Sequence, residues 1–158
     1  MGTHNDGTQI RLASLGLQVE KTAAVAASGS STDLFSVDGG NVWLLGLVGD
    51  VETVLVANTD LDIDFDPDDG GSDVAMSTVL VADSDPTGTL YTLNSALTGG
   101  GIMIETLDIA YNGMFASPFF LTVGDIKLVS AGGGAGGGSI HWYAWWLPID
   151  EGATLTAS

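Results

Sequence analysis

The stretch TDLDIDFDPDDGG, residues 59–71, holds the densest set of potentially reactive side chains in this sequence of 158 residues. It places an aspartate at every second position from Asp60 to Asp68 and then adds Asp69. Closely spaced carboxylates can bind calcium, but a helix–loop–helix calcium loop also needs a glycine at position six and a glutamate at position twelve. A loop starting at Asp64 has Asp69 where the glycine belongs, and a start two residues earlier also lacks that glycine. The run therefore does not match this motif.

A period of two explains the same stretch without a ligand. Leu61, Ile63 and Phe65 would point to one face of a strand, and the aspartates of positions 60–66 to the other. This alternation predicts a strand with one face in the core and one face in water. Because four like charges on one face repel each other, high salt, a basic partner or a bound cation must offset the cost. We predict no metal site, and the residual candidates for a loosely held cation are Asp66, Asp68 and Asp69.

The other stretches that invite a chemical interpretation lack essential parts. The glycine-rich AGGGAGGGS (residues 131–139) has no lysine of a phosphate-binding loop and is followed by strand-like residues, so we expect a flexible hairpin loop. His4 and His141 lie too far apart for a typical zinc pair, no G-x-S-x-G motif occurs, and there is no cysteine. Two carboxylates could serve glycoside hydrolysis, but the spacing favours no pair. We predict a non-enzymatic protein without catalytic residues or a cofactor.

The aromatic stretch HWYAWW, residues 141–146, predicts a strand with large rings on both faces. Trp142 and Trp146 would share one face, and Tyr143 and Trp145 the other. Rings on both faces indicate burial on both, so we expect one face in the core and the other in a subunit contact. A platform that stacks on sugars is the alternative interpretation of the same rings.

The charge balance restricts the partners. Twenty acidic residues against three cations, Arg11, Lys21 and Lys127, give a formal net charge of −17. Nucleic acids and anionic membranes need a basic surface, so neither is an expected partner. The start, MGTHNDGTQIRLAS, has no basic region followed by an apolar run, and no segment reaches the roughly 20 apolar residues of a membrane span. We therefore expect synthesis in the cytoplasm without a signal peptide.

Short strands separated by turn residues predict the fold class. With 23 glycines and alternating apolar positions, we expect an all-β, single-domain, jelly-roll-like β-sandwich over residues 31–158. Residues 1–30 are expected to form an extended N-terminal arm with a first strand, in which Arg11 and Lys21 contact a neighbour. Residues 52–66 are predicted as one long strand with a bend, and residues 41–51 as a central strand buried on both faces. Residues 72–83 suit a short helix or a strand. The remaining predicted strands lie at 34–37, 89–93, 101–110, 117–130, 139–149 and 153–158.

Two segments, LFSVDGGNVWLLGLVGDVET (34–53) and GSIHWYAWWLPIDEGATLTAS (138–158), resemble small virion proteins of tailed bacteriophages. The likeness lies in L-F-x-V-x-G-G, in L-x-G-x-V-x-T and in an aromatic strand that ends W…P-[LI]-D-x-G-A-x-[VL]-x-A. It covers about a quarter of the chain and carries no catalytic residue. The acidic run departs from the pattern, in which that strand is less charged.

The resemblance implies a head decoration (cement) protein, a homotrimer on the outer capsid surface that binds the major capsid protein. A tail or baseplate protein of the same phage and a carbohydrate-binding module are the alternatives. The interface residues that we predict are Arg11, Lys21, Trp142, Tyr143, Trp145 and Trp146.

Overall fold

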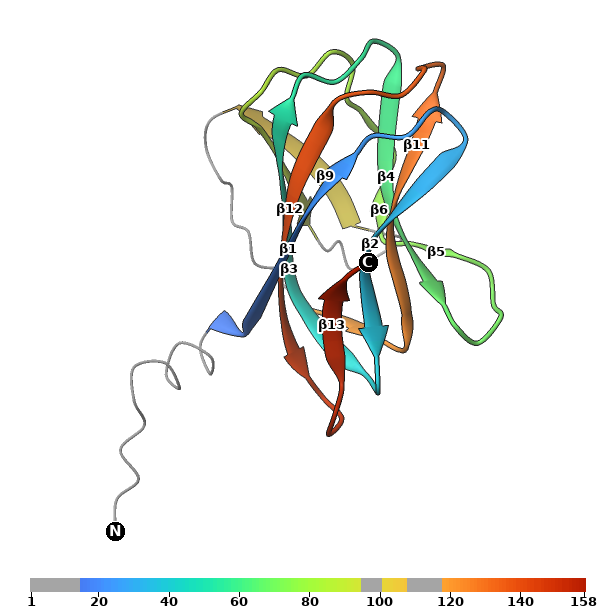
Figure 1. Ribbon diagram of the computed structural model, residues 1–158, viewed down its shortest axis with the longest axis vertical. Coiled ribbons are helices and arrows are strands. Elements are labelled where there is room, and N and C mark those ends of the chain that lie inside the picture. Colours follow the sequence, from blue (N-terminus) through green and yellow to red (C-terminus); the bar gives the residue numbers. More distant parts are fainter. Residues whose placement is uncertain (1–14, 95–100, 108–117) are drawn as a thin grey trace.

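Two β-sheets packed face to face form the body of the protein, with β1, β3 and β12 on one side and β2, β4 and β11 on the other (Figure 1). The structure is a computed structural model, and it describes residues 15–94, 101–107 and 118–158. An all-β sandwich is therefore confirmed, whereas the jelly-roll connectivity remains a prediction. Arg11 and His4 lie outside the described residues.

The first sheet, sheet A, has the strand order β1-β12-β3-β8-β9-β6, with β10 also paired to β3. All its pairs are antiparallel except β6 with β9. Its strands are β1 (Leu17–Ala24), β3 (Val42–Thr53), β6 (Ser77–Thr78), β8 (Thr89–Asn94), β9 (Gly101–Leu107), β10 (Phe119–Leu121) and β12 (Ser139–Pro148).

The second sheet, sheet B, has the order β13-β2-β11-β4-β5, with β7 also paired to β4, and is antiparallel throughout. Its strands are β2 (Ser30–Asp38), β4 (Thr59–Pro67), β5 (Val74–Ala75), β7 (Leu80–Val81), β11 (Gly124–Gly132) and β13 (Thr154–Ala157).

The core forms between the inner faces of the two sheets. Sheet B contributes the alternating Leu61, Ile63 and Phe65 of β4, as the sequence predicts, and sheet A contributes Trp142 of β12. Trp142 pairs with Gly49 of β3, and a Cβ at that glycine would lie 2.9 Å from the indole ring. The missing side chain thus makes the space that the largest core residue occupies.

The prediction of one long strand over residues 52–66 is wrong. The chain leaves sheet A after Thr53 and enters sheet B at Thr59. Asn58 adopts a left-handed backbone conformation with φ 59°, and its backbone N–H donates a hydrogen bond to Asp83 Oδ1 over 2.6 Å. Asparagine tolerates this conformation better than most residues, so the local Asn-Thr pair turns the chain from one sheet to the other.

The glycine-rich segment is also not a hairpin loop, because it joins β11 of sheet B to β12 of sheet A and these strands are not paired. It packs on the connection that follows β1, where Gly137 N donates to Val25 O and Ser28 N donates to Gly134 O. At Gly136 a Cβ would lie 2.6 Å from the backbone nitrogen of Ala27. Close backbone packing therefore explains a glycine there.

Residues 72–83, predicted as a helix or a strand, form three two-residue strands, β5, β6 and β7. The predicted strand over 117–130 divides into β10 and β11, and β9 ends at Leu107 within the described residues. β1 supplies the first strand that we expected near the N-terminal end.

Candidate interaction surface

The two faces of β12 have different environments. Trp142 and Trp146 are buried in the core, with exposed fractions of 1% and 6%. His141, Tyr143 and Trp145 point to the outer face of sheet A and are half-buried. The predicted alternation of inner and outer side chains is confirmed. Trp142 and Trp146, which were also predicted as interface residues, are buried in the core instead, and a partner contact of the outer face stays a prediction.

The outer side chains of β12 form a continuous row of rings, which we call the aromatic row: His141, Tyr143 and Trp145. The ring centroids of His141 and Tyr143 are 4.5 Å apart, and those of Tyr143 and Trp145 are 6.3 Å apart with an interplanar angle of 26°. On the β1 side, Glu20 pairs with Tyr143 and Gln18 with Trp145. The row lies in the interior of sheet A, because β1 and β3 flank β12.

Carboxylates surround the His141 end of the aromatic row. Glu52 Oε1 lies 3.4 Å from Nδ1 of His141, and Glu20 Oε2 lies 3.6 Å from Nε2. Thr22 Oγ1 is 2.7 Å from Nδ1, and Asp50 of β3 is the cross-strand neighbour of His141. The ring thus links β1, β12 and β3, and it carries an ion pair to each glutamate only when it is protonated.

A second aromatic pair lies at the other end of β3. Trp43 and Phe120 of β10 are in edge-to-face contact at 5.4 Å and remain 40% and 52% exposed. This exposure corrects the expectation that residues 41–51 are buried on both faces. Sequence reasoning missed the pair because strand β10 is short and its partner β3 lies more than seventy residues earlier in the chain.

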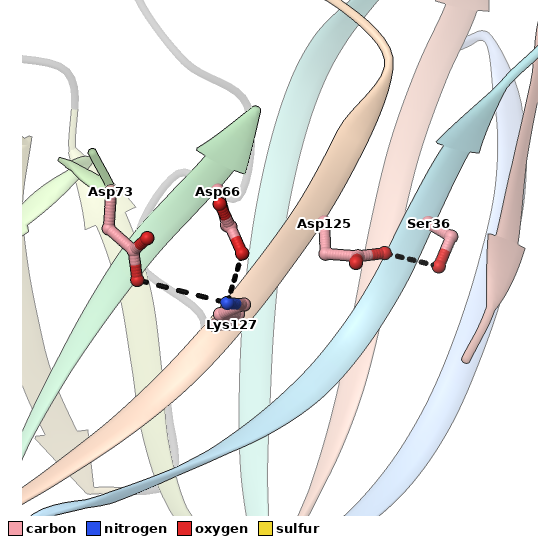
Figure 2. Close-up of polar contacts among 5 residues, drawn as sticks. All are labelled: Ser36, Asp66, Asp73, Asp125 and Lys127. Carbon is pink, nitrogen blue, oxygen red and sulfur yellow. Dashed lines mark hydrogen bonds and ion pairs between the residues drawn. The ribbon is translucent and has the colours of Figure 1, made fainter. Parts of the chain in front are cut away.

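The outer face of sheet B is acidic around one lysine (Figure 2). Lys127 of β11 donates a hydrogen bond to Asp66 Oδ2 and lies 3.8 Å from Asp73 Oδ2. The hydrogen bond to Asp66 is the main cause that raises the pKa of Lys127, so its charge is secured. On the same sheet, Ser36 donates to Asp125 over 2.5 Å.

The aspartates of β4 are half-buried, whereas the sequence predicted a face in water. Burial raises the pKa of the Asp62 and Asp64 carboxyls, with like charges adding to the effect: Asp64 acts on Asp62, and Asp73 on Asp64. One oxygen of each carboxylate, Oδ1, is buried without a hydrogen-bond partner in the described structure. The charged carboxylates of this strand therefore destabilise the fold through partial desolvation as well as through repulsion between like charges.

The residual cation candidates are not gathered into a ligand set. Asp66 pairs with Lys127, Asp69 Oδ1 accepts a 2.8 Å hydrogen bond from the amide of Gly71, and Asp68 is exposed. Within residues 15–94, 101–107 and 118–158, no three histidines, cysteines or acids come close enough to hold a metal. A conventional metal site would need such a group.

Lys21, predicted to contact a neighbour, is engaged within the chain. Its Nζ donates to the main-chain oxygens of Asp33 and Ser158, on the sheet B side of β1. These bonds join the edges of the two sheets. Any partner that uses Lys21 must break them or bind around them.

Comparisons of the chain with protein-family models, with curated proteins and with solved structures give no match. Over the described ranges, no helix combines the length and the apolar character needed to cross a membrane.

Proposed function

We propose that this chain is a non-enzymatic structural protein of a tailed-phage particle, a decoration protein on the outer surface of the head. In this role it assembles as a homotrimer and binds the major capsid protein. The resemblance of residues 34–53 and 138–158 to small virion proteins suggests the particle, and the surface of sheet A suggests the mode of contact.

The aromatic row is the observation that carries this proposal. Trp142 on the other face of β12 already anchors the core, so Tyr143 and Trp145 are not needed there. Half-buried tyrosine and tryptophan side chains on a rigid sheet lose little conformational entropy when a partner covers them. Trp43 and Phe120 extend the exposed aromatic surface of the same sheet.

The charge distribution suggests an orientation. Sheet B carries Asp62, Asp64 and Asp66 on its outer face, together with further acids on β11 and before β5. A strongly acidic face in water favours solubility and repulsion between particles. Sheet A therefore faces the shell in our proposal, where contacts spread over several capsid subunits resist the pressure of the packaged genome.

Binding to expanded capsids tests the proposal directly. Wild-type protein is expected to bind and to raise the temperature at which heads release DNA, whereas the double variant Tyr143→Ser/Trp145→Ser is expected to lose at least about 90% of this binding, since aromatic anchors dominate interfaces. Asp62→Asn/Asp64→Asn on sheet B is the control and should bind normally. If wild-type protein does not bind expanded capsids and does not change the temperature at which heads release DNA, the proposal is wrong. Imaging of labelled virions then tells whether the tail carries the protein.

The aromatic row also favours a second candidate, a carbohydrate-binding module. Tyr143 and Trp145 are near-parallel neighbours, and the polar Gln18 and Glu20 border them. Sugars stack on such rings, and their hydroxyl groups can donate hydrogen bonds to the Glu20 carboxylate and exchange hydrogen bonds with the Gln18 amide. A glycan array read with the same Tyr143→Ser/Trp145→Ser variant distinguishes this candidate, because a specific glycan signal lost in the variant would favour it over decoration.

A further inference from the structure

We propose that the outer face of sheet A binds a basic protein surface, one that places arginine or lysine side chains over Tyr143 and Trp145. This inference rests on the proposed function and adds the chemistry of the partner. It follows from the carboxylates that border the aromatic row, not from the net charge alone.

The first step concerns what a partner must cover. Glu20 pairs directly with Tyr143, and its side chain is 60% exposed; Glu52, beside His141, is 45% exposed. A partner that covers the rings also removes water from these two carboxylates. Removing a charge from water without a countercharge is unfavourable, so a partner that covers these carboxylates must supply positive charge.

The chain supplies little of this countercharge within the described residues. Lys127 is bound to Asp66 on the other sheet, and Lys21 donates to main-chain oxygens at the sheet edge. Only His141 lies between the two glutamates, and it balances them only when protonated. A second copy of this chain has the same shortage, with three lysines and arginines against twenty acids, so it is a poor partner for this face.

The rings themselves favour cations. The face of an indole or phenol ring attracts a guanidinium or ammonium group within about 6 Å, and arginine does so most often. The cross-strand neighbour of Trp145 on β3 is Gly46, which has no side chain to cover the ring on that side. A guanidinium group over Tyr143 or Trp145 could therefore also pair with Glu20, which combines both attractions in one contact.

Peptide binding tests the inference. The probe is a blocked ten-residue peptide with arginine at every second position and serine between, and its matched control has citrulline, the neutral analogue, in place of arginine. Titration at 0.15 M salt should show binding of the arginine peptide and at least about tenfold weaker binding of the citrulline peptide, with the indole signal of Trp145 shifting in the NMR spectrum.

Three variants locate the bound peptide. Glu20→Gln/Glu52→Gln and Tyr143→Leu/Trp145→Leu should each weaken binding by at least about fivefold, as expected for lost charge-assisted and cation–π contacts. Asp62→Asn/Asp64→Asn removes two negative charges from sheet B and should change the affinity by less than about twofold, the expectation for a distant, screened charge.

The inference fails if the sheet B variant weakens binding as much as the glutamate variant, because the peptide then follows net charge. It also fails if the citrulline peptide binds equally well, or if sugars and not basic peptides shift the Trp145 signal. Capsid binding separates this failure from that of the proposed function: if Glu20→Gln/Glu52→Gln still binds capsids while Tyr143→Ser/Trp145→Ser does not, decoration stands and the basic partner does not.

Discussion

At the scale of single residues, the unusual feature is Asp62 and Asp64, two half-buried carboxylates on one strand. Their raised pKa values mean that folding disfavours their charged forms relative to the unfolded chain. A raised carboxyl pKa costs stability at neutral pH. This cost shrinks as the pH falls through the raised values and is gone below the ordinary value of 3.8.

The first prediction follows from this loss of stability at neutral pH. Asp62→Asn should raise the melting temperature at pH 7 by about 2–4 °C, the shift expected for roughly 1 kcal/mol in a chain of this length, because it removes a desolvated charge at nearly constant shape. The gain over wild type should diminish toward pH 4, where the wild-type carboxyl takes up a proton. Thermal unfolding followed by circular dichroism from pH 7 to pH 4 measures both effects.

Asp68→Asn is the matched control, because Asp68 is exposed on the same segment. A gain for Asp68→Asn equal to that for Asp62→Asn would show that net charge, not burial of the carboxylate, sets the stability. A loss of stability in Asp62→Asn would mean that the charged form has a favourable partner, such as a bound cation.

At the scale of elements, β12 has a structural face and an exposed face, and substitutions on the two should behave differently. Trp142→Ala removes the largest core side chain and should cost about 3–5 kcal/mol of unfolding free energy. Trp145→Ala on the outer face should cost about 1 kcal/mol or less while it reduces partner binding. Denaturant unfolding of both variants, beside capsid binding of Trp145→Ala, measures the contrast.

Equal destabilisation by the two alanine variants would contradict this division of β12. It would show that Trp145 is required for the stability of the fold, and the aromatic row could no longer be treated as a surface that is free to bind a partner. Tyr143→Phe, which keeps the ring and removes only the hydroxyl, is the mild control and should leave stability within about 0.5 kcal/mol of wild type.

The sequence predicted what depends on local alternation. The inward positions Leu61, Ile63 and Phe65, and the division of β12 into two faces, follow from the period of two, because each pattern lies within one strand. The crossing at Asn58 was not predicted, since the residues on either side are both strand-like and only their pairing partners show that they belong to different sheets.

The acidic surface was predicted only in part, because its local pattern is visible in the sequence and its long-range pairing is not. The run at residues 59–71 showed the aspartates, but not that Lys127, 61 residues after Asp66, pairs with them. Sheet pairing between distant segments brings these groups together, and no local signal encodes the register. Flanking strands also bury parts of the carboxylates that an isolated strand would leave in water.

At the scale of the whole molecule, a net charge of −17 on 158 residues acts on every contact. Self-repulsion of this size destabilises a compact chain at low ionic strength. Most of the acids lie on exposed or half-buried positions, so dissolved ions can screen them. The stability of the fold should therefore depend on salt more than that of a balanced domain.

The last prediction is that sodium chloride raises the melting temperature at pH 7, by several degrees between 0.02 M and 1 M. The Debye length falls to about 3 Å at 1 M, which screens the aspartates of β4 from each other. Calcium chloride separates screening from binding. At matched ionic strength, melting-temperature shifts equal to those in sodium chloride indicate screening, whereas a much larger shift at about 1 mM calcium indicates a specific site. Because Asp66 is held by Lys127 and Asp69 by its own turn, we expect equal shifts.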